Sequence, residues 1–175
     1  NSVTQIRSGM ALQGLTVEEG KAETRRLIAQ LAPYAHPGND VEYARLFQLL
    51  ANGHLKSTPL DLEAARLSLE KALSYAPDDG SVMLRLMEAE FLGQNFGTAY
   101  GWAERLVVQD FPNPLKARRA AVHCALEAGK WAAAEQQAKA YLELAPEDRS
   151  IREVVRLLRS EEDPRLALRL FRSGN

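Results

Sequence analysis

Three histidines and one cysteine are the side chains of this sequence best suited to metal binding or nucleophilic chemistry: His36, His54, His123 and Cys124. The histidines lie in three separate segments, and the weak pair of His123 with Glu127 is the nearest they come to a metal-ligand pattern. His123 and Cys124 are adjacent, so on a helix their side chains would point about 100° apart and could not share a nucleophilic centre. The sequence therefore predicts no metal site and no catalytic pair.

Motifs for other enzyme chemistries are also missing from the sequence. It contains no glycine-rich phosphate loop, no GxSxG motif and no recognisable pair of catalytic carboxylates. Cys124 is the single cysteine, which excludes an internal disulfide, and its place in an apolar helical stripe predicts a buried, inert thiol. We expect no enzyme activity and no cofactor.

A binding surface is the more promising chemistry. Lys116, Arg119 and His123 are spaced by three and four residues, so on a helix they share one face and form a short basic strip. Such a strip could bind an acidic or amphipathic segment of another protein. The alternative is an ordinary solvated helix face.

The strip belongs to a segment that reads as two amphipathic helices, residues 114–128 and 131–145. Asn113 can cap the first helix and Pro114 suits its first position. Gly129 is expected to form the turn between the helices, and Pro146 to end the second. The first helix carries a stripe of small residues: Ala117, Ala120, Ala121, Cys124, Ala125 and Ala128.

This helical pair recurs along the chain. Pro112 precedes Pro146 by 34 residues, Pro77 precedes Pro112 by 35, and each proline ends a similar run, LEKALSYAP, AERLVVQDFP and AKAYLELAP. The offsets of Gly129, Trp131 and Pro146 resemble those of the tetratricopeptide repeat (TPR), a helix–turn–helix unit of ~34 residues. The resemblance implies an all-α fold, a TPR-like α-solenoid in which antiparallel helix pairs form a right-handed superhelix.

The resemblance also implies a domain organisation. Residues 1–175 would form a single helical-repeat domain. The start at Asn1 without Met suggests a fragment of a longer chain or a processed product. Leucines of 165–171 and Phe171 are expected to lie exposed on the last helix. The expected parts are 1–38 (decayed repeat or N-terminal cap), 39–77 (repeat with an inserted loop, 52–59), 78–112 (repeat), 113–146 (repeat) and 147–175 (partial repeat).

Within the inserted segment, Thr58 and Pro59 are expected to start the second helix of the pair. An insertion in a solenoid lies on one face, where it is either sequence drift without a function or part of the binding surface. The loop around His54 is therefore a second candidate surface.

In tetratricopeptide arrays the first helix of each pair lines a concave groove. Transferred by position, that register implies a set of partner-binding residues in this sequence. They are Arg45, Gln48, Arg85, Glu88, Lys116, Arg119, His123, Glu127 and Glu153.

Composition limits the partners. With 22 basic and 23 acidic residues the net charge is −1, which gives no global attraction to nucleic acid. No apolar run approaches the ~20 residues that cross a bilayer, so we expect a soluble protein, cytoplasmic or periplasmic, without direct membrane insertion.

Two functions remain open, together with the enzyme that the sequence disfavours. The first is a non-catalytic scaffold that binds a peptide or helix of a partner protein in the groove. The second is a structural spacer within a longer TPR array of a bacterial secretion or cell-envelope assembly protein. The oligomeric state is left open.

Overall fold

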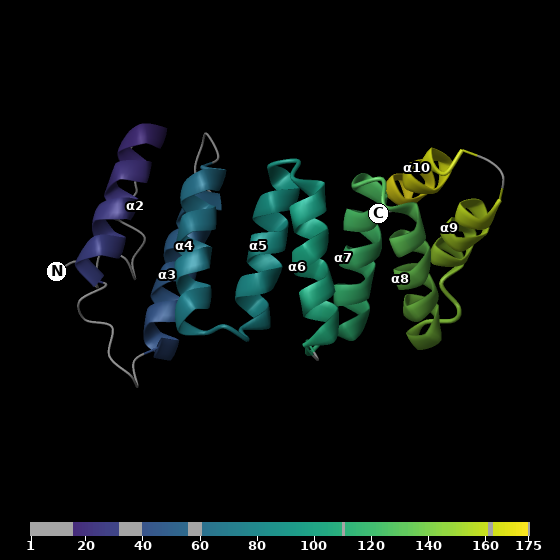
Figure 1. Cartoon of the computed structure of the whole chain (residues 1–175), viewed down its shortest axis with the longest axis horizontal. Helices are drawn as coiled ribbons and strands as arrows, with labels where there is room; N and C mark the ends of the chain where they lie inside the picture. Colours follow the sequence, from purple (N-terminus) through teal and green to yellow (C-terminus); the bar gives the residue numbers. More distant parts are fainter. Residues whose placement is uncertain (1–15, 32–39, 56–60, 110, 161–162, 175) are drawn as a thin grey trace. The chain divides into compact units, whose positions relative to one another are not determined.

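The structure of this protein is a computed structural model that describes residues 16–31, 40–55, 61–109, 111–160 and 163–174. Within these ranges there are helices and no strands, which confirms the all-α prediction (Figure 1). The helices are α2 (Val17–Leu31), α3 (Asp40–Leu55), α4 (Leu62–Tyr75), α5 (Gly80–Leu92), α6 (Phe96–Val108), α7 (Pro114–Glu127), α8 (Trp131–Leu144), α9 (Arg149–Arg159) and α10 (Arg165–Ser173).

The chain groups into two compact units that divide between Gly93 and Gln94. The first unit contains α2 to α5, and the second contains α6 to α10. None of the described helices combines the length and apolar character needed to cross a membrane.

In the first unit, α3 and α4 form the most extensively packed helix pair, and α4 also packs against α2 and α5. Aromatic side chains close one end of this pair. The ring of Tyr75 at the end of α4 stacks on Tyr43 at 5.4 Å and on Phe47 at 5.9 Å between centroids. Phe47 is completely buried, so this end of the helix pair is held by aromatic packing.

The predicted loop 52–59 is wrong over its first half, because α3 continues through Asn52 and Gly53 to Leu55. Both residues have low helix propensity, but the extra turn places His54 in the interior, where it is 2% exposed. Burial against α4 therefore outweighs the propensity.

Capping side chains define where α2 and α4 begin. A capping box begins α2, since the Thr16 amide donates to Glu19 Oε2 at 2.9 Å and the Glu19 amide donates to Thr16 Oγ1 at 3.4 Å. Thr58 and Pro59 lie outside the described residues, and α4 begins later than expected. Its N-cap is Asp61, whose Oδ1 accepts from the Ala64 amide at 3.1 Å.

In the second unit, α6, α7, α8 and α9 each pack against the next helix in sequence. The predicted helix pair is confirmed: Asn113 caps α7 and accepts from the Lys116 amide at 2.9 Å, and α8 follows after a short turn. Gly129 forms this turn with φ +68°, while the Lys130 amide donates to Ala125 O at 2.9 Å. A left-handed glycine and such a hydrogen bond are typical of a Schellman helix end.

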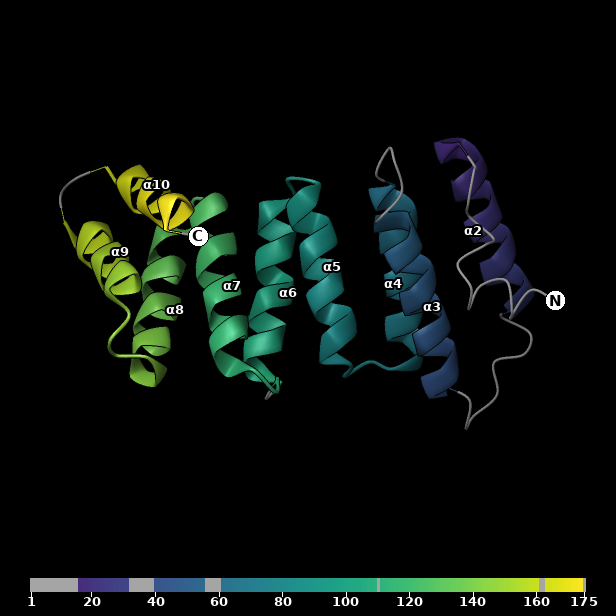
Figure 2. The same cartoon turned by 180° about the vertical axis from the view of Figure 1, so that it is seen from behind.

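Helix α10 departs from the expected arrangement. It packs against both α9 and α7, and it runs across the axes of α7 and α8 rather than along them (Figures 1 and 2). Phe171 is 1% exposed, so the prediction that it lies exposed is wrong. The reason is that α10 covers a side-chain surface of α7.

Candidate functional site

The surface of α7 that α10 covers consists of Arg119, His123 and Glu127, called the α7 face below. These are three of the predicted groove residues, and they share a face because they are four residues apart. The ring of Phe171 packs against this face. Its centroid lies 4.9 Å from that of His123 and 5.3 Å from Arg119 Cζ, a cation–π distance.

Next to the aromatic contact, Glu127 binds Arg172 through both carboxylate oxygens. Arg172 Nε donates to Oε1 at 2.8 Å and Nη2 donates to Oε2 at 2.5 Å. The Glu127 side chain is only 5% exposed, and hydrogen bonding to Arg172 lowers its pKa. A two-point contact of this kind favours arginine over lysine, because a planar guanidinium matches both oxygens.

His123 completes the α7 face. Its Nε2 lies 3.4 Å from Glu127 Oε1. Burial lowers its pKa, and the nearby Glu127 carboxylate acts in the opposite direction. Because the burial effect prevails, the imidazole is neutral at pH 7, and the predicted basic strip has less positive charge than the sequence suggests.

Arg119 is also engaged within the fold. Its Nη1 donates to Asp148 Oδ2 at 3.2 Å, and the hydroxyl of Tyr141 donates to the same oxygen at 3.1 Å. The other oxygen, Oδ1, caps α9 by accepting from the Ile151 amide at 3.0 Å. Asp148 therefore joins α7, α8 and the start of α9.

The first unit contains an equivalent contact. Gln48 Nε2 of α3 donates to Asp79 Oδ2 at 3.0 Å, and Asp79 Oδ1 caps α5 by accepting from the Ser81 amide at 2.8 Å. In both units a predicted groove residue thus reaches the N-cap aspartate of a later helix. Both aspartates stand two residues after a period-ending proline, in APDD and APED, a signal that the sequence analysis missed.

Two predicted groove residues, Arg45 in the first unit and Lys116 in the second, have exposed side chains. The three others form short-range pairs on their own helices. Arg85 Nη1 donates to Glu88 Oε2 at 2.8 Å on α5, and Arg156 Nε donates to Glu153 Oε1 at 2.8 Å on α9. Exposed pairs of this kind contribute about 0–1 kcal/mol, so they leave these residues available to a partner.

The second candidate surface, the loop around His54, is described only as far as Leu55, and residues 56–60 lie outside the described part of the chain. His54 is buried on α3, with Nδ1 3.9 Å from Oδ2 of Asp61, and the two side chains are 3% and 4% exposed. Burial lowers the pKa of His54 despite the nearby carboxylate. His54 is therefore a core residue.

The chemistry of the remaining candidates is also resolved. Cys124 is buried, and burial raises the pKa of its thiol to about 12, so at neutral pH it is not a nucleophile. Within the part of the chain that the structure describes, no three His, Cys, Asp or Glu side chains form a metal-binding group. His36 lies outside that part.

Helix α10 is held by few buried groups. Only Ala167 and Phe171 of its nine residues are buried. Burying a Phe side chain contributes about 1.5–3 kcal/mol, and the ion pair joins an Arg172 side chain that is 58% exposed to a Glu127 side chain that is 5% exposed. Because isolated helices shorter than ~12 residues are marginal, docking of α10 must also offset the cost of ordering it. The α7 face is therefore covered by a short helix with few buried side chains.

Comparison with known proteins adds no family to these observations. No protein-family model matches the chain, and no curated protein has a significantly similar sequence.

Proposed function

We propose that this chain is a non-catalytic TPR-like scaffold that binds a peptide or helix of a partner protein through the first helices of its helix pairs. The observation that carries the proposal is the docking of α10 on the α7 face. Three residues assigned to a groove by register, Arg119, His123 and Glu127, contact an amphipathic helix there. A surface that accommodates one helix is suited to accommodate another.

The exposed cations of both units support the same proposal. Arg45 and Lys116 extend from α3 and α7 into solvent and are available to carboxylates of an acidic or amphipathic partner. The thiol chemistry of Cys124 supports a non-catalytic role, because its raised pKa keeps it protonated.

The spacer function is the second candidate, and a specific observation favours it. Arg119 and Gln48, both predicted to face a partner, instead contact the N-cap aspartates Asp148 and Asp79. Such contacts stiffen the packing of successive helices, as a spacer in a longer bacterial array would require.

Affinity capture of proteins from the native source tests whether the chain is a scaffold or a spacer. The chain carries Lys116→Glu in one variant and Arg45→Glu in another, and captured proteins are identified by mass spectrometry. Under the scaffold proposal, a partner captured by the parent is reduced at least tenfold by one of these variants, with strong salt dependence in the parent.

Arg149→Glu is the matched control, since Arg149 is an exposed cation at the start of α9 and was not assigned to the groove. Capture that is unaffected by Lys116→Glu and by Arg45→Glu would reject the proposed surface. A chain that captures nothing, but whose helix period continues through its neighbouring sequence, would favour the spacer.

A further inference from the structure

The contact between α10 and α7 has the composition of a recognition site. On one side is a pair of consecutive residues, Phe171 and Arg172. On the other side, His123 and Arg119 contact the aromatic ring, and both oxygens of Glu127 accept from the guanidinium. Each half of the Phe–Arg pair thus meets groups of matching chemistry.

One residue of the α7 face is positioned by a group outside α10. Arg119 is fixed by its hydrogen bond to Asp148 on the α8–α9 side, and Glu127 lies next to His123 one turn away on the same helix. The Arg119 contact would remain if α10 moved away, whereas Glu127 would lose the guanidinium that binds both of its oxygens. A preformed site costs less to bind than one that must be ordered.

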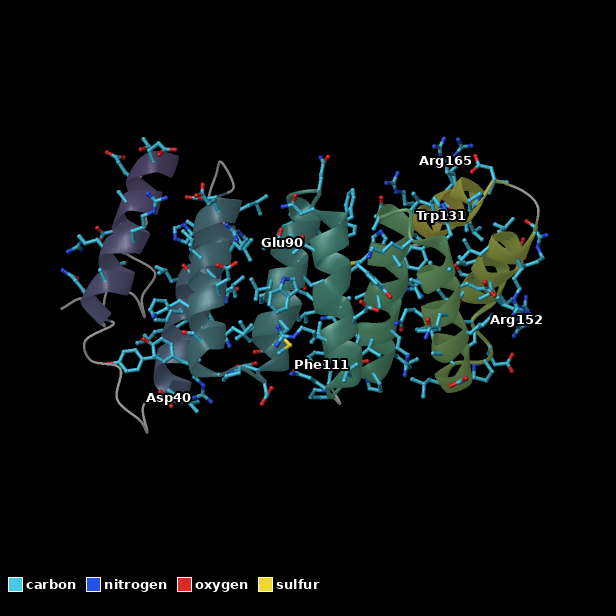
Figure 3. All side chains as sticks on the ribbon, in the orientation of Figure 1. Asp40, Glu90, Phe111, Trp131, Arg152 and Arg165 are labelled. Carbon is cyan, nitrogen blue, oxygen red and sulfur yellow. The ribbon has the colours of Figure 1, made fainter. Side chains whose placement is uncertain are left out.

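Helix α10 itself is replaceable. It buries two side chains, and its first turn is capped by one side chain, since Asp163 Oδ1 accepts from the Arg165 amide at 3.0 Å. Its arginines Arg165, Arg169 and Arg172 are exposed, and Arg165 is labelled in Figure 3. A cationic amphipathic helix therefore occupies a site that has a carboxylate at its edge.

We infer that the α7 face is a recognition site for a short cationic amphipathic helix in which an aromatic residue is followed by arginine, and that α10 occupies this site in cis. A partner helix with the same pair binds by displacing α10, so α10 sets a threshold for binding. The inference rests on the proposed scaffold function and defines the chemistry of the partner segment that binds the α7 face. That segment is cationic, whereas Lys116, outside the face, is available to carboxylates elsewhere in the partner.

The test uses the full chain and a fluorescein-labelled peptide with the sequence of residues 163–174, measured by fluorescence anisotropy. Arg172→Glu in the chain places a carboxylate opposite Glu127 and releases α10, so this variant should bind the peptide at least tenfold more tightly than the parent. The parent binds weakly because its own α10 competes.

Charge exchange makes the test specific. The Glu127→Arg chain should not bind the original peptide but should bind one that carries Arg172→Glu. The chain with both Glu127→Arg and Arg172→Glu restores the cis contact and should bind both peptides weakly. Glu143→Arg, an exposed site on α8, is the matched control and should behave like the parent.

Circular dichroism measures the helix content of each variant and so checks that it is folded. If the Arg172→Glu chain is not folded, Phe171→Ala provides a second way to release α10. Equal peptide binding by the parent and the released chains, or the absence of peptide binding by all of them, would overturn the inference. So would a Glu127→Arg chain that does not distinguish the two peptides.

These experiments test the recognition site on α7 separately from the proposed scaffold function. If the peptides do not bind as expected while partner capture still depends on Lys116 or Arg45, the inference is wrong and the proposed function stands. If the charge exchange succeeds and no partner is captured, the site is real and the proposed function loses support.

Discussion

Arg119 and Asp148, 29 residues apart in sequence, are joined by a hydrogen bond of 3.2 Å between Nη1 and Oδ2. Arg119 comes from the middle of α7, and Asp148 is the N-cap of α9. One carboxylate thus satisfies a helix terminus with one oxygen and binds two neighbouring helices with the other. Arg119, which the repeat register assigns to a groove, therefore has a structural role as well.

The first prediction separates two interactions of Asp148, the capping of α9 and the contact with Arg119. Asp148→Ala removes the cap and should lower the free energy of unfolding by about 1–2 kcal/mol. Asp148→Asn keeps a capping oxygen but loses the charge that Arg119 contacts, so it should cost less than the alanine variant. Urea denaturation measures both, with Lys116→Ala expected within about 0.5 kcal/mol of the parent. Equal losses for Asn and Ala would show that capping contributes little.

The second prediction concerns Gly129, whose φ of +68° is unfavourable for any residue with a Cβ. Gly129→Ala should destabilise the chain by about 1–2 kcal/mol. Gly101→Ala provides the control, because Gly101 is inside α6 and a Cβ there meets nothing within 4 Å. That substitution should stabilise by about 0.5–1 kcal/mol. Opposite signs in thermal unfolding are expected, and a shared sign would contradict the turn geometry.

The third prediction concerns pH. Burial lowers the pKa values of His54 and His123 below 6.5 in the folded chain, so the unfolded chain binds more protons once the pH falls under that value. The free energy of unfolding should therefore be highest above pH 6.5 and decrease as the pH falls through 6.5 toward the folded pKa values. Urea denaturation at a series of pH values measures this slope.

Substitution assigns the slope to its source. His54→Leu removes one of the two histidines, so the change in stability across this window should become smaller even if overall stability also changes. A slope unaffected by His54→Leu would mean that the histidine is not buried as a neutral ring.

The fourth prediction concerns Cys124, which is 1% exposed and has a thiol pKa raised to about 12. The folded chain should react with a thiol reagent such as DTNB far more slowly than the chain in guanidinium chloride. Ala132→Cys places a second thiol at an exposed position of α8 and should react quickly without denaturant. Rapid reaction of Cys124 in the folded parent would show that α7 opens readily.

Much of the local structure could be predicted from the sequence, because it depends on residues near one another. Asn113 and Pro114 at the start of α7, and Gly129 at its end, act within a few residues of themselves. The end of α3 could not be predicted in this way. Gly53 favours a break, yet α3 continues past it to Leu55 with His54 buried, and burial depends on residues distant in the sequence.

The candidate site was predictable in part. Spacing identified Lys116, Arg119 and His123 as one face of the predicted helix, and repeat register added Glu127 to the groove residues. The contact of the α7 face with Phe171 and Arg172 was not predictable, since it joins residues 45 to 52 positions apart whose spacing carries no periodic signal. Aspartates after the period-ending prolines were a visible repeat signal, yet their contacts with Gln48 and Arg119 required the structure.

The placement of α10 on α7 has a consequence for the order of events during synthesis. A ribosome adds the residues of α7, α8 and α9 before it adds Phe171 and Arg172, so the α7 face is synthesised before its own occupant. A partner that binds the chain before α10 docks meets no competitor, whereas one that arrives later must compete with α10. The timing of the encounter, as well as affinity, would then decide which helix is bound.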